Sequence, residues 1–257
     1  MLELKVSRTG VVPEVPDDAQ VWRDWSGVPR AYGYTTNSQH WIFLPEVAAY
    51  RFTAAGGVVE AIARAAPEEE VEDAYRRHVL PFALQALGSE LLHASAVVTP
   101  SGAVAFCGRS SAGKSTLAHR LARRGHEPLA DDALMFEPTD AGVDAIRIPF
   151  TVRIEGRVTP LDAPGSDRFP LAAVFVVEPA AEVDPARPEV IALPHSAAFP
   201  LLLYHAHCFS FRDEHRTRLM TDRYLKLAAR VPAYRLRYRR DIDRLPALLD
   251  AVEGTLA

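Results

Sequence analysis

The sequence predicts a mixed α/β fold with a β-rich N-terminal region, and three observations carry this prediction. Strand-like runs separated by Pro, Gly and Asn-Ser fill residues 1–52. Strand and helix patterns alternate from residue 91 onward. A glycine-containing loop over 108–115 separates an apolar strand pattern from an amphipathic helix pattern. We therefore expect a β-rich region with one helix over 1–90, packed on an α/β domain over 91–257.

The composition is that of a globular protein, with 48% hydrophobic and 24% charged residues in 257. No apolar run approaches the roughly 18 residues that a membrane span needs, and the first residues lack a signal-peptide pattern. The net charge of −4 provides no basic field that would attract nucleic acid. Two cysteines, Cys107 and Cys208, form no disulfide framework or zinc motif. We therefore expect a cytoplasmic protein with neither a membrane nor a nucleic acid as partner.

The N-terminal region is expected to contain five short strands followed by one helix. The expected strands are Leu2–Val6, Val21–Trp25, Ala31–Thr36, His40–Leu44 and Ala48–Phe52. The helix extends from about Pro67 to Ala86, because apolar residues recur there at helical spacing, and Pro81 predicts a break or kink in it. The strands show no evident core of their own, which favours packing on the rest of the chain.

The second half is expected to alternate strands and helices. The expected strands are Leu91–Val98, Ala103–Cys107, Pro128–Ala130, Val143–Ile148, Val152–Glu155, Leu171–Glu178 and Ala233–Arg237. The expected helices are Gly113–Arg124, Ala197–Cys208, Asp213–Arg230 and Ile242–Val252. The acidic, proline-rich stretch 179–188 is expected to be a surface loop.

Residues 108–115 match the phosphate-loop pattern G-x-x-x-x-G-K-[ST] at every defined position. Glycines allow the backbone N–H groups to turn toward phosphate oxygens, and the following helix presents its positive end to the same anion. Lys114 is expected to reach the β- and γ-phosphates and Ser115 to bind Mg²⁺. The expected nucleotide-binding residues are Gly108, Ser110, Ser111, Ala112, Gly113, Lys114, Ser115 and Thr116.

Two further features can supply chemistry to this loop. Asp131 and Asp132 follow a short strand, and two such carboxylates can divide metal binding and proton acceptance in phosphoryl transfer. Adjacent strand residues point to opposite sides, which favours separate roles, while a solvated Asp-Asp turn is the alternative. His93 lies among small apolar residues, a setting typical of a core histidine.

The remaining candidates are expected to be structural or exposed. His195, His205, His207 and Cys208 show no metal-binding spacing. The arginine-rich run 234–240 alternates with period two, which predicts an edge strand with a charged face. An acidic or phosphorylated partner is the alternative for that face.

Three segments in this order resemble the catalytic domain of the HPr kinase/phosphorylase family. They are Leu92-His93-Ala94-Ser95-Ala96-Val97, the loop Gly108–Ser115, and Arg124-Gly125-His126 followed by Leu129-Ala130-Asp131-Asp132. The resemblance covers 91–132 strongly and extends loosely to residue 252. The pattern Arg230–Leu236 with a final helix is similar to HPr-kinase-related proteins such as lasso-peptide precursor kinases. Two loop positions differ from the family pattern, because Arg109 replaces a small or acidic residue and Ser111 replaces a glycine.

The resemblance implies a P-loop kinase core like that of HPr kinase and phosphoenolpyruvate carboxykinase. It implies ATP- and Mg²⁺-dependent phosphorylation of a serine on a peptide or small protein, possibly a natural-product precursor, by an enzyme that can form homo-oligomers. By position, Asp131 is then the general base, Lys114 and His93 assist at the phosphates, and Ser115 and Asp132 bind the metal, with Glu155 as a further candidate ligand. The alternatives are a kinase for a small hydroxyl compound and a non-catalytic nucleotide-binding interaction protein.

Overall fold

The computed structural model describes residues 2–24, 26–154, 157–161, 167–184 and 186–256, and the chain forms two compact units. Unit 1 consists of Met1–Ser89, Arg153–Pro160 and Cys208–Thr217, and unit 2 of Glu90–Val152, Leu161–His207 and Arg218–Ala257. Two segments from the second half of the chain thus belong to the first unit. The packing of one unit on the other stays a prediction.

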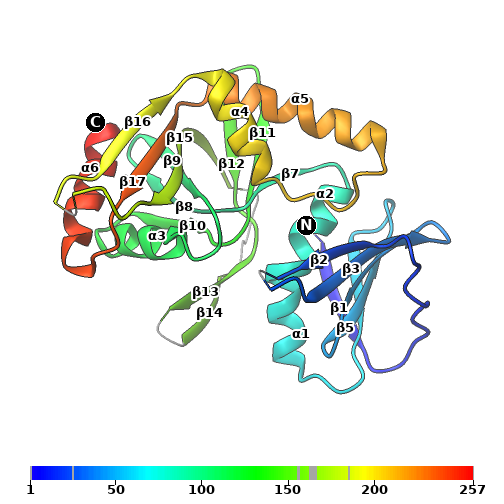
Figure 1. The fold of residues 1–257 in the computed structure, drawn as a ribbon. Helices are drawn as coiled ribbons and strands as arrows, with labels where there is room; N and C mark the ends of the chain where they lie inside the picture. Colours follow the sequence, from blue (N-terminus) through cyan, green and yellow to red (C-terminus); the bar gives the residue numbers. More distant parts are fainter. Residues whose placement is uncertain (1, 25, 155–156, 162–166, 185, 257) are drawn as a thin grey trace. The chain divides into compact units, whose positions relative to one another are not determined.

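Unit 1 is built on a six-stranded sheet (Figure 1). Its strands are β1 (Glu3–Ser7), β2 (Gln20–Arg23), β3 (Pro29–Thr36), β4 (Gln39–Leu44), β5 (Ala48–Phe52) and β6 (Val58–Ile62). The order is β1-β6-β5-β4-β3-β2, in which β1 and β6 are parallel and the other neighbours are antiparallel. Strand β6 was not predicted, although it separates β1 from β5 and so completes the sheet.

The helical segment of unit 1 runs without interruption through α1 (Glu68–Ala74), the π-helical turn η1 (Tyr75–Val79) and α2 (Leu80–Ala86). Pro81 lies inside this continuous helix and has no N–H to donate. The break or kink predicted at Pro81 takes the form of a wider, π-helical turn just before the proline, and the helix continues through it.

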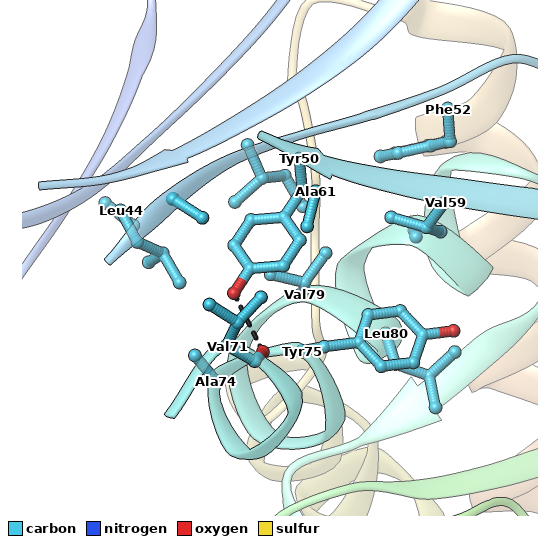
Figure 2. Packing of buried hydrophobic residues seen from close by; sticks show 14 of the residues in the cluster. Leu44, Tyr50, Phe52, Val59, Ala61, Val71, Ala74, Tyr75, Val79 and Leu80 are labelled. Atoms are coloured by element: carbon cyan, nitrogen blue, oxygen red, sulfur yellow. Dashed lines mark hydrogen bonds between the residues drawn. The ribbon is translucent and has the colours of Figure 1, made fainter. Parts of the chain in front are cut away.

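One face of this sheet buries a core of its own against the helices. Figure 2 shows Tyr50 of β5 with its hydroxyl directed at the Val71 carbonyl of α1, a 2.9 Å hydrogen bond. Val71, Val79 and Leu80 pack around it and are fully buried. Phe209, from the inserted Cys208–Thr217 segment, joins the same cluster. The expectation that these strands lack a core was wrong, because the helix at 68–86 supplies its second layer.

Unit 2 contains a nine-stranded mixed sheet. Its strands are β7 (Glu90–Leu92), β8 (Ala94–Thr99), β9 (Gly102–Cys107), β10 (Glu127–Ala130), β11 (Leu134–Pro138), β12 (Val143–Ile146), β15 (Arg168–Pro179), β16 (Glu189–Leu193) and β17 (Ala233–Tyr238). The main path is β10-β8-β9-β15-β12-β11-β7, and β17 pairs with both β15 and β16. Strands β9, β15 and β17 are parallel, so their carboxyl ends meet at one edge of the sheet.

Four helices pack against this sheet. A buried cluster joins α3 (Lys114–Arg123) and α6 (Leu245–Leu256), which follows the short helix η2 (Ile242–Arg244), to strands β8, β9, β15 and β17. Helix α4 (His195–Tyr204) packs on β16 and β17. In α5 (Glu214–Arg230) the Tyr224 ring packs edge-on against Phe136 of β11.

Strands β13 (Phe150–Ile154) and β14 (Arg157–Leu161) form a separate two-stranded sheet. No helix in the described part of the chain is both long and apolar enough to cross a membrane.

Candidate active site

The loop between β9 and α3 has a backbone that requires glycine at two positions. Gly108 and Gly113 have φ values of +153° and +97°. A Cβ at Gly108 would lie 2.8 Å from the Val177 carbonyl oxygen, and one at Gly113 would lie 2.5 Å from the Tyr238 hydroxyl oxygen. Both contacts are shorter than van der Waals packing allows, so the two glycines of the motif are fixed by sterics as well as by φ.

The second half of the loop has the geometry of an anion-binding turn. Ser111 adopts the left-handed region at φ +62°, one residue before Ala112 and two before Gly113. Left-handed residues within such a turn direct successive N–H groups into one concavity. Helix α3 begins at the next residue, so its positive N-terminal end faces the same space.

Lys114 lies at the mouth of this loop with little exposure to solvent. Its side-chain Nζ donates hydrogen bonds to the carbonyl oxygens of Gly108 at 3.1 Å and Arg109 at 3.4 Å. Burial lowers the pKa of Lys114, and the carboxylates of Asp132 and Asp131 act in the opposite direction. The lysine is therefore a desolvated cation with two acids nearby, and its desolvation strengthens its attraction for an anion.

Asp131 joins the loop to two neighbouring strands. The hydroxyls of Ser115 and Ser95 each donate a 2.7 Å hydrogen bond to Oδ1 of Asp131. The two hydroxyl oxygens lie 3.4 Å apart. Ser95 on β8 is fully buried. Sequence reasoning missed its contribution, although a polar residue within an apolar strand was a signal for it.

Asp132 has a backbone that the strand prediction did not anticipate. Strand β10 ends at Ala130, and Asp132 adopts φ +65°. The argument from strand alternation was therefore wrong in its basis, because neither aspartate lies in the strand. The Asp132 carbonyl accepts hydrogen bonds from His93 Nδ1 at 2.9 Å and His207 Nε2 at 3.3 Å. Because a carbonyl only accepts, each of these ring nitrogens carries the proton.

His93 lies at a break in the strand that was expected over 91–98. Strand β7 before it pairs with β11, whereas β8 after it pairs with β9 and β10. The His93 N–H donates to the His205 carbonyl at 2.7 Å, and its ring lies edge-on to His207 at 5.8 Å. Burial, followed by the charge of Lys114, lowers the pKa of His93, which keeps the imidazole neutral at pH 7.

His205 and His207 have different surroundings in the structure. His205 is buried, and its pKa is lowered to about 4, first by burial and then by His93 and Lys114. His207 contacts the Asp132 carbonyl, a place at the site that its spacing did not predict. Among the described residues, no group of three or more His, Cys, Asp or Glu side chains is arranged to hold a metal ion.

The next residues are the remaining ones that the sequence predicted to bind nucleotide or metal. Ser110 and Thr116 are exposed, on the loop and on the first turn of α3. Ala112 is buried, and its N–H donates to the Arg109 carbonyl at 3.0 Å. Glu155 lies outside the described residues.

The arginine-rich strand β17 differs from its prediction. It was expected at a sheet edge, but it lies between β15 and β16, because β16 was not recognised in the sequence. Arg237 forms ion pairs with Glu178, Glu182 and Glu189, so this part of the charged face is neutralised within the protein. The end of the strand lies beside the glycine loop, and the side chains of Tyr238 and Arg240 donate hydrogen bonds to carbonyl oxygens of that loop.

Comparisons with known proteins show similarity to solved structures. No protein-family model matches the chain, and no curated protein matches its sequence. Among solved structures, the chain is similar to the Hpr(Ser) kinase/phosphatase from Coxiella burnetii, with 14% identity and a TM-score of 0.40. The match covers 64% of this chain and 88% of that one. At this TM-score the likeness carries no conclusion about chemistry, which has to come from the site itself.

Proposed function

We propose that the chain is an ATP- and Mg²⁺-dependent kinase that transfers the γ-phosphate to a serine hydroxyl of a peptide or small protein. The observation that carries the proposal is the convergence, at the carboxyl end of β9, of an anion-binding turn, a buried lysine and the Ser115–Asp131 pair. A cation and amides that bind phosphate, combined with a hydroxyl–carboxylate pair that binds a hard metal, are the parts that phosphoryl transfer requires.

The phosphate donor fits the loop on two grounds. Side chains at Gly108 and Gly113 would collide with the Val177 carbonyl and the Tyr238 hydroxyl, so glycine allows the loop to curl closely against its own sheet. The N–H groups of the first turn of α3 and the Lys114 ammonium together supply positive charge where phosphate oxygens would lie.

The metal fits Ser115 and Asp131. Their oxygens are hard ligands already 2.7 Å apart, and Mg²⁺ in kinases takes one or two carboxylates together with phosphate oxygens and water. Mg²⁺ bound there would neutralise charge on the β- and γ-phosphates. The resemblance assigns the metal side to Asp132 and the base to Asp131, but the contact with Ser115 favours the reverse assignment.

Asp132 is accordingly our proposed proton acceptor. The charge of its carboxylate raises the pKa of Lys114 against the effect of burial, so this carboxylate acts on the lysine that would bind the phosphates. It would take the proton of the attacking serine hydroxyl as the new phosphoester bond forms. His93 and His207 hold the Asp132 carbonyl, which supports the left-handed backbone from which this carboxylate projects.

Our assignment of the phosphate acceptor rests on the resemblance of residues 91–132 to the HPr kinase/phosphorylase family. This resemblance favours a serine in a polypeptide as the group that is phosphorylated. A small hydroxyl compound as acceptor, or nucleotide binding without transfer, are the alternatives that an assay must separate.

Thermal unfolding with Mg·ATP, Mg·ADP and ATP in EDTA tests nucleotide binding first, beside a Lys114→Ala variant. A ligand at about 100 times its dissociation constant adds about 2.7 kcal/mol. For a chain of this size that raises the unfolding midpoint by about 5–10 °C. We expect the full rise with Mg·ATP, a smaller one without Mg²⁺ and none in the variant. A flat response to saturating nucleotide would overturn the proposal.

Transfer from γ-labelled ATP then tests the acceptor, with a serine-containing peptide library beside the same library with alanine at each serine. Label on the serine library alone supports the proposal. Label on small hydroxyl compounds, or nucleotide binding with no transfer to either class, favours one of the alternatives.

A further inference from the structure

We infer that Tyr238 and Arg240, at the end of β17, are positioning residues that hold the second half of the 108–115 loop in its anion-binding conformation. The inference rests on the proposed function, because it concerns how that site binds the phosphates of its nucleotide. These residues lie more than a hundred positions from the loop in sequence and carry no recognisable motif.

Two adjacent loop carbonyls are bonded by these side chains. The Tyr238 hydroxyl donates to the Ala112 carbonyl at 2.8 Å, and an Arg240 guanidinium N–H donates to the Ser111 carbonyl at 2.6 Å. The Tyr238 hydroxyl also occupies the space that a side chain at Gly113 would need. Tyr238, at the end of β17, and Arg240, two residues beyond it, therefore together contact each residue from 111 to 113.

The two bonds orient the N–H groups on the opposite side of the loop. In a trans peptide, C=O and N–H point in opposite directions. The peptide whose carbonyl bonds to Tyr238 carries the Gly113 N–H, so this bond turns that N–H away from β17. The peptide whose carbonyl bonds to Arg240 carries the Ala112 N–H, which closes the turn on the Arg109 carbonyl at 3.0 Å. Tyr238 thus orients an N–H at the start of α3, and Arg240 secures the turn before it.

Ser111 shows why such support is needed. Its φ of +62° is a conformation that a residue with a Cβ adopts unfavourably. Residues persist there where surrounding contacts compensate, and the Arg240 bond is made to the carbonyl of this residue.

Tyr238 is well suited to hold the loop because its own position is fixed. Its backbone is opposite Pro179 in the β15–β17 pair, and its carbonyl accepts the Ala180 N–H at 2.8 Å. Its ring packs against the buried cluster beneath α3 and α6. Burial raises the pKa of Tyr238, with Arg240 opposing, so its hydroxyl keeps the proton that it donates.

The test compares Tyr238→Phe and Arg240→Ala with matched controls in the full chain. Tyr234→Phe is the control for the tyrosine, because its ring packs on Phe175 of the same sheet. Arg239→Ala removes the same charge from an exposed neighbour. The dissociation constant for Mg·ATP is measured by calorimetry, and KM and kcat by transfer to the peptide library.

We expect Tyr238→Phe to raise the dissociation constant and KM for Mg·ATP about five- to tenfold, the size of one hydrogen bond, with kcat within about twofold. Arg240→Ala should raise both about two- to fivefold, and adding Ser111→Gly should restore part of the loss, because glycine relieves the left-handed strain. Both controls should bind as the wild type does.

Wild-type affinity in both Tyr238→Phe and Arg240→Ala would overturn the inference while leaving the proposed function intact. An equal effect of the controls would overturn it too, because the loss would then reflect sheet packing or net charge. If the wild type binds no nucleotide, the proposed function itself fails, and the inference fails with it. Arg240 is exposed, so its variant still decides the question should Tyr238→Phe not fold.

Discussion

The Ser115 hydroxyl donates a 2.7 Å hydrogen bond to Oδ1 of Asp131, joining the first turn of α3 to the residue that follows β10. This bond brings together a hydroxyl at the end of the loop and a carboxylate just beyond β10. It also distinguishes the two adjacent aspartates, because Asp131 accepts the serine hydroxyls with its carboxylate, whereas Asp132 accepts His93 and His207 with its backbone carbonyl. The two acids therefore have different surroundings within one site. We predict that neutralising one of them impairs a different part of the function than neutralising the other.

Replacement of Asp131 and Asp132 by asparagine should separate metal binding from proton transfer. Asp131→Asn should remove the extra stabilisation that Mg²⁺ gives to bound ATP, because the carboxylate beside Ser115 is lost. Asp132→Asn should keep the Mg·ATP shift and lower the transfer rate by about 10²–10⁴-fold. Thermal unfolding and single-turnover transfer measure the two effects. The opposite pattern in the two variants would restore the assignment that the resemblance implies.

Two of the glycines with positive φ in this region give a matched test of steric fit. Gly113 and Gly125 have φ values of +97° and +102°, but a Cβ meets the Tyr238 hydroxyl at the first and open space at the second. Gly125→Ala should therefore cost about 1–2 kcal/mol from backbone strain alone. Gly113→Ala should cost measurably more in urea unfolding.

The additional loss of stability in Gly113→Ala, compared with Gly125→Ala, should depend on the Tyr238 hydroxyl. In a Tyr238→Phe background the nearest atom that remains near the added methyl is ring Cζ, 3.7 Å away. The difference between Gly113→Ala and Gly125→Ala should then shrink. An unchanged difference in that background would show that the hydroxyl is not the source of the clash.

The part of the site that sequence could predict is the part carried by local pattern. Strand β9, the loop and α3 lie within one continuous stretch, and the apolar strand, the glycines and the helical spacing are all readable there. Strands β6, β11, β14 and β16 were missed, although none of them is shorter than β1 or β10, which were predicted. The missing β16 caused the wrong placement of β17 at an edge.

The contacts that complete the site could not be predicted, because they join positions distant in sequence. Ser95, His207, Tyr238 and Arg240 reach their partners across 36, 75, 126 and 129 positions. No periodicity encodes such pairings; they follow from the sheet order, which places the carboxyl ends of β9, β15 and β17 at one edge. The left-handed turn at Asp132 likewise escapes an argument that assumes a regular strand.

His205 predicts a loss of stability in acid. Its pKa of about 4 in the folded chain lies below the unfolded value of about 6.5, so the unfolded state binds more protons between these values. The stability from burying the neutral ring is therefore present above pH 6.5 and is lost as the pH falls toward 4. Relative to a His205→Gln variant, the wild type should lose up to about 2 kcal/mol between pH 7 and pH 5. Urea unfolding of both proteins at the two pH values measures this, and parallel curves would contradict it.

From the hydrogen bond of Tyr50 we predict a loss of stability that is confined to unit 1. Its buried hydroxyl donates to the Val71 carbonyl, and Tyr50→Phe should remove about 1 kcal/mol of stability, the value of one neutral hydrogen bond. All three tryptophans of the chain lie within residues 1–89, so their fluorescence reports on unit 1. The fluorescence-detected urea midpoint should therefore fall in Tyr50→Phe, whereas Tyr234→Phe in unit 2 serves as the control that leaves it in place.

Tyr50→Phe also tests whether nucleotide binding needs the full stability of unit 1. The loop, Lys114, Asp131 and Asp132 all belong to unit 2, so Tyr50→Phe should keep the wild-type dissociation constant for Mg·ATP although its unit 1 unfolds more readily. Calorimetry under native conditions measures this constant. A loss of affinity as large as that of Lys114→Ala would mean that the nucleotide site depends on the sheet and helices of residues 1–89. The site would then be more than the loop, the lysine and the two acids that unit 2 supplies.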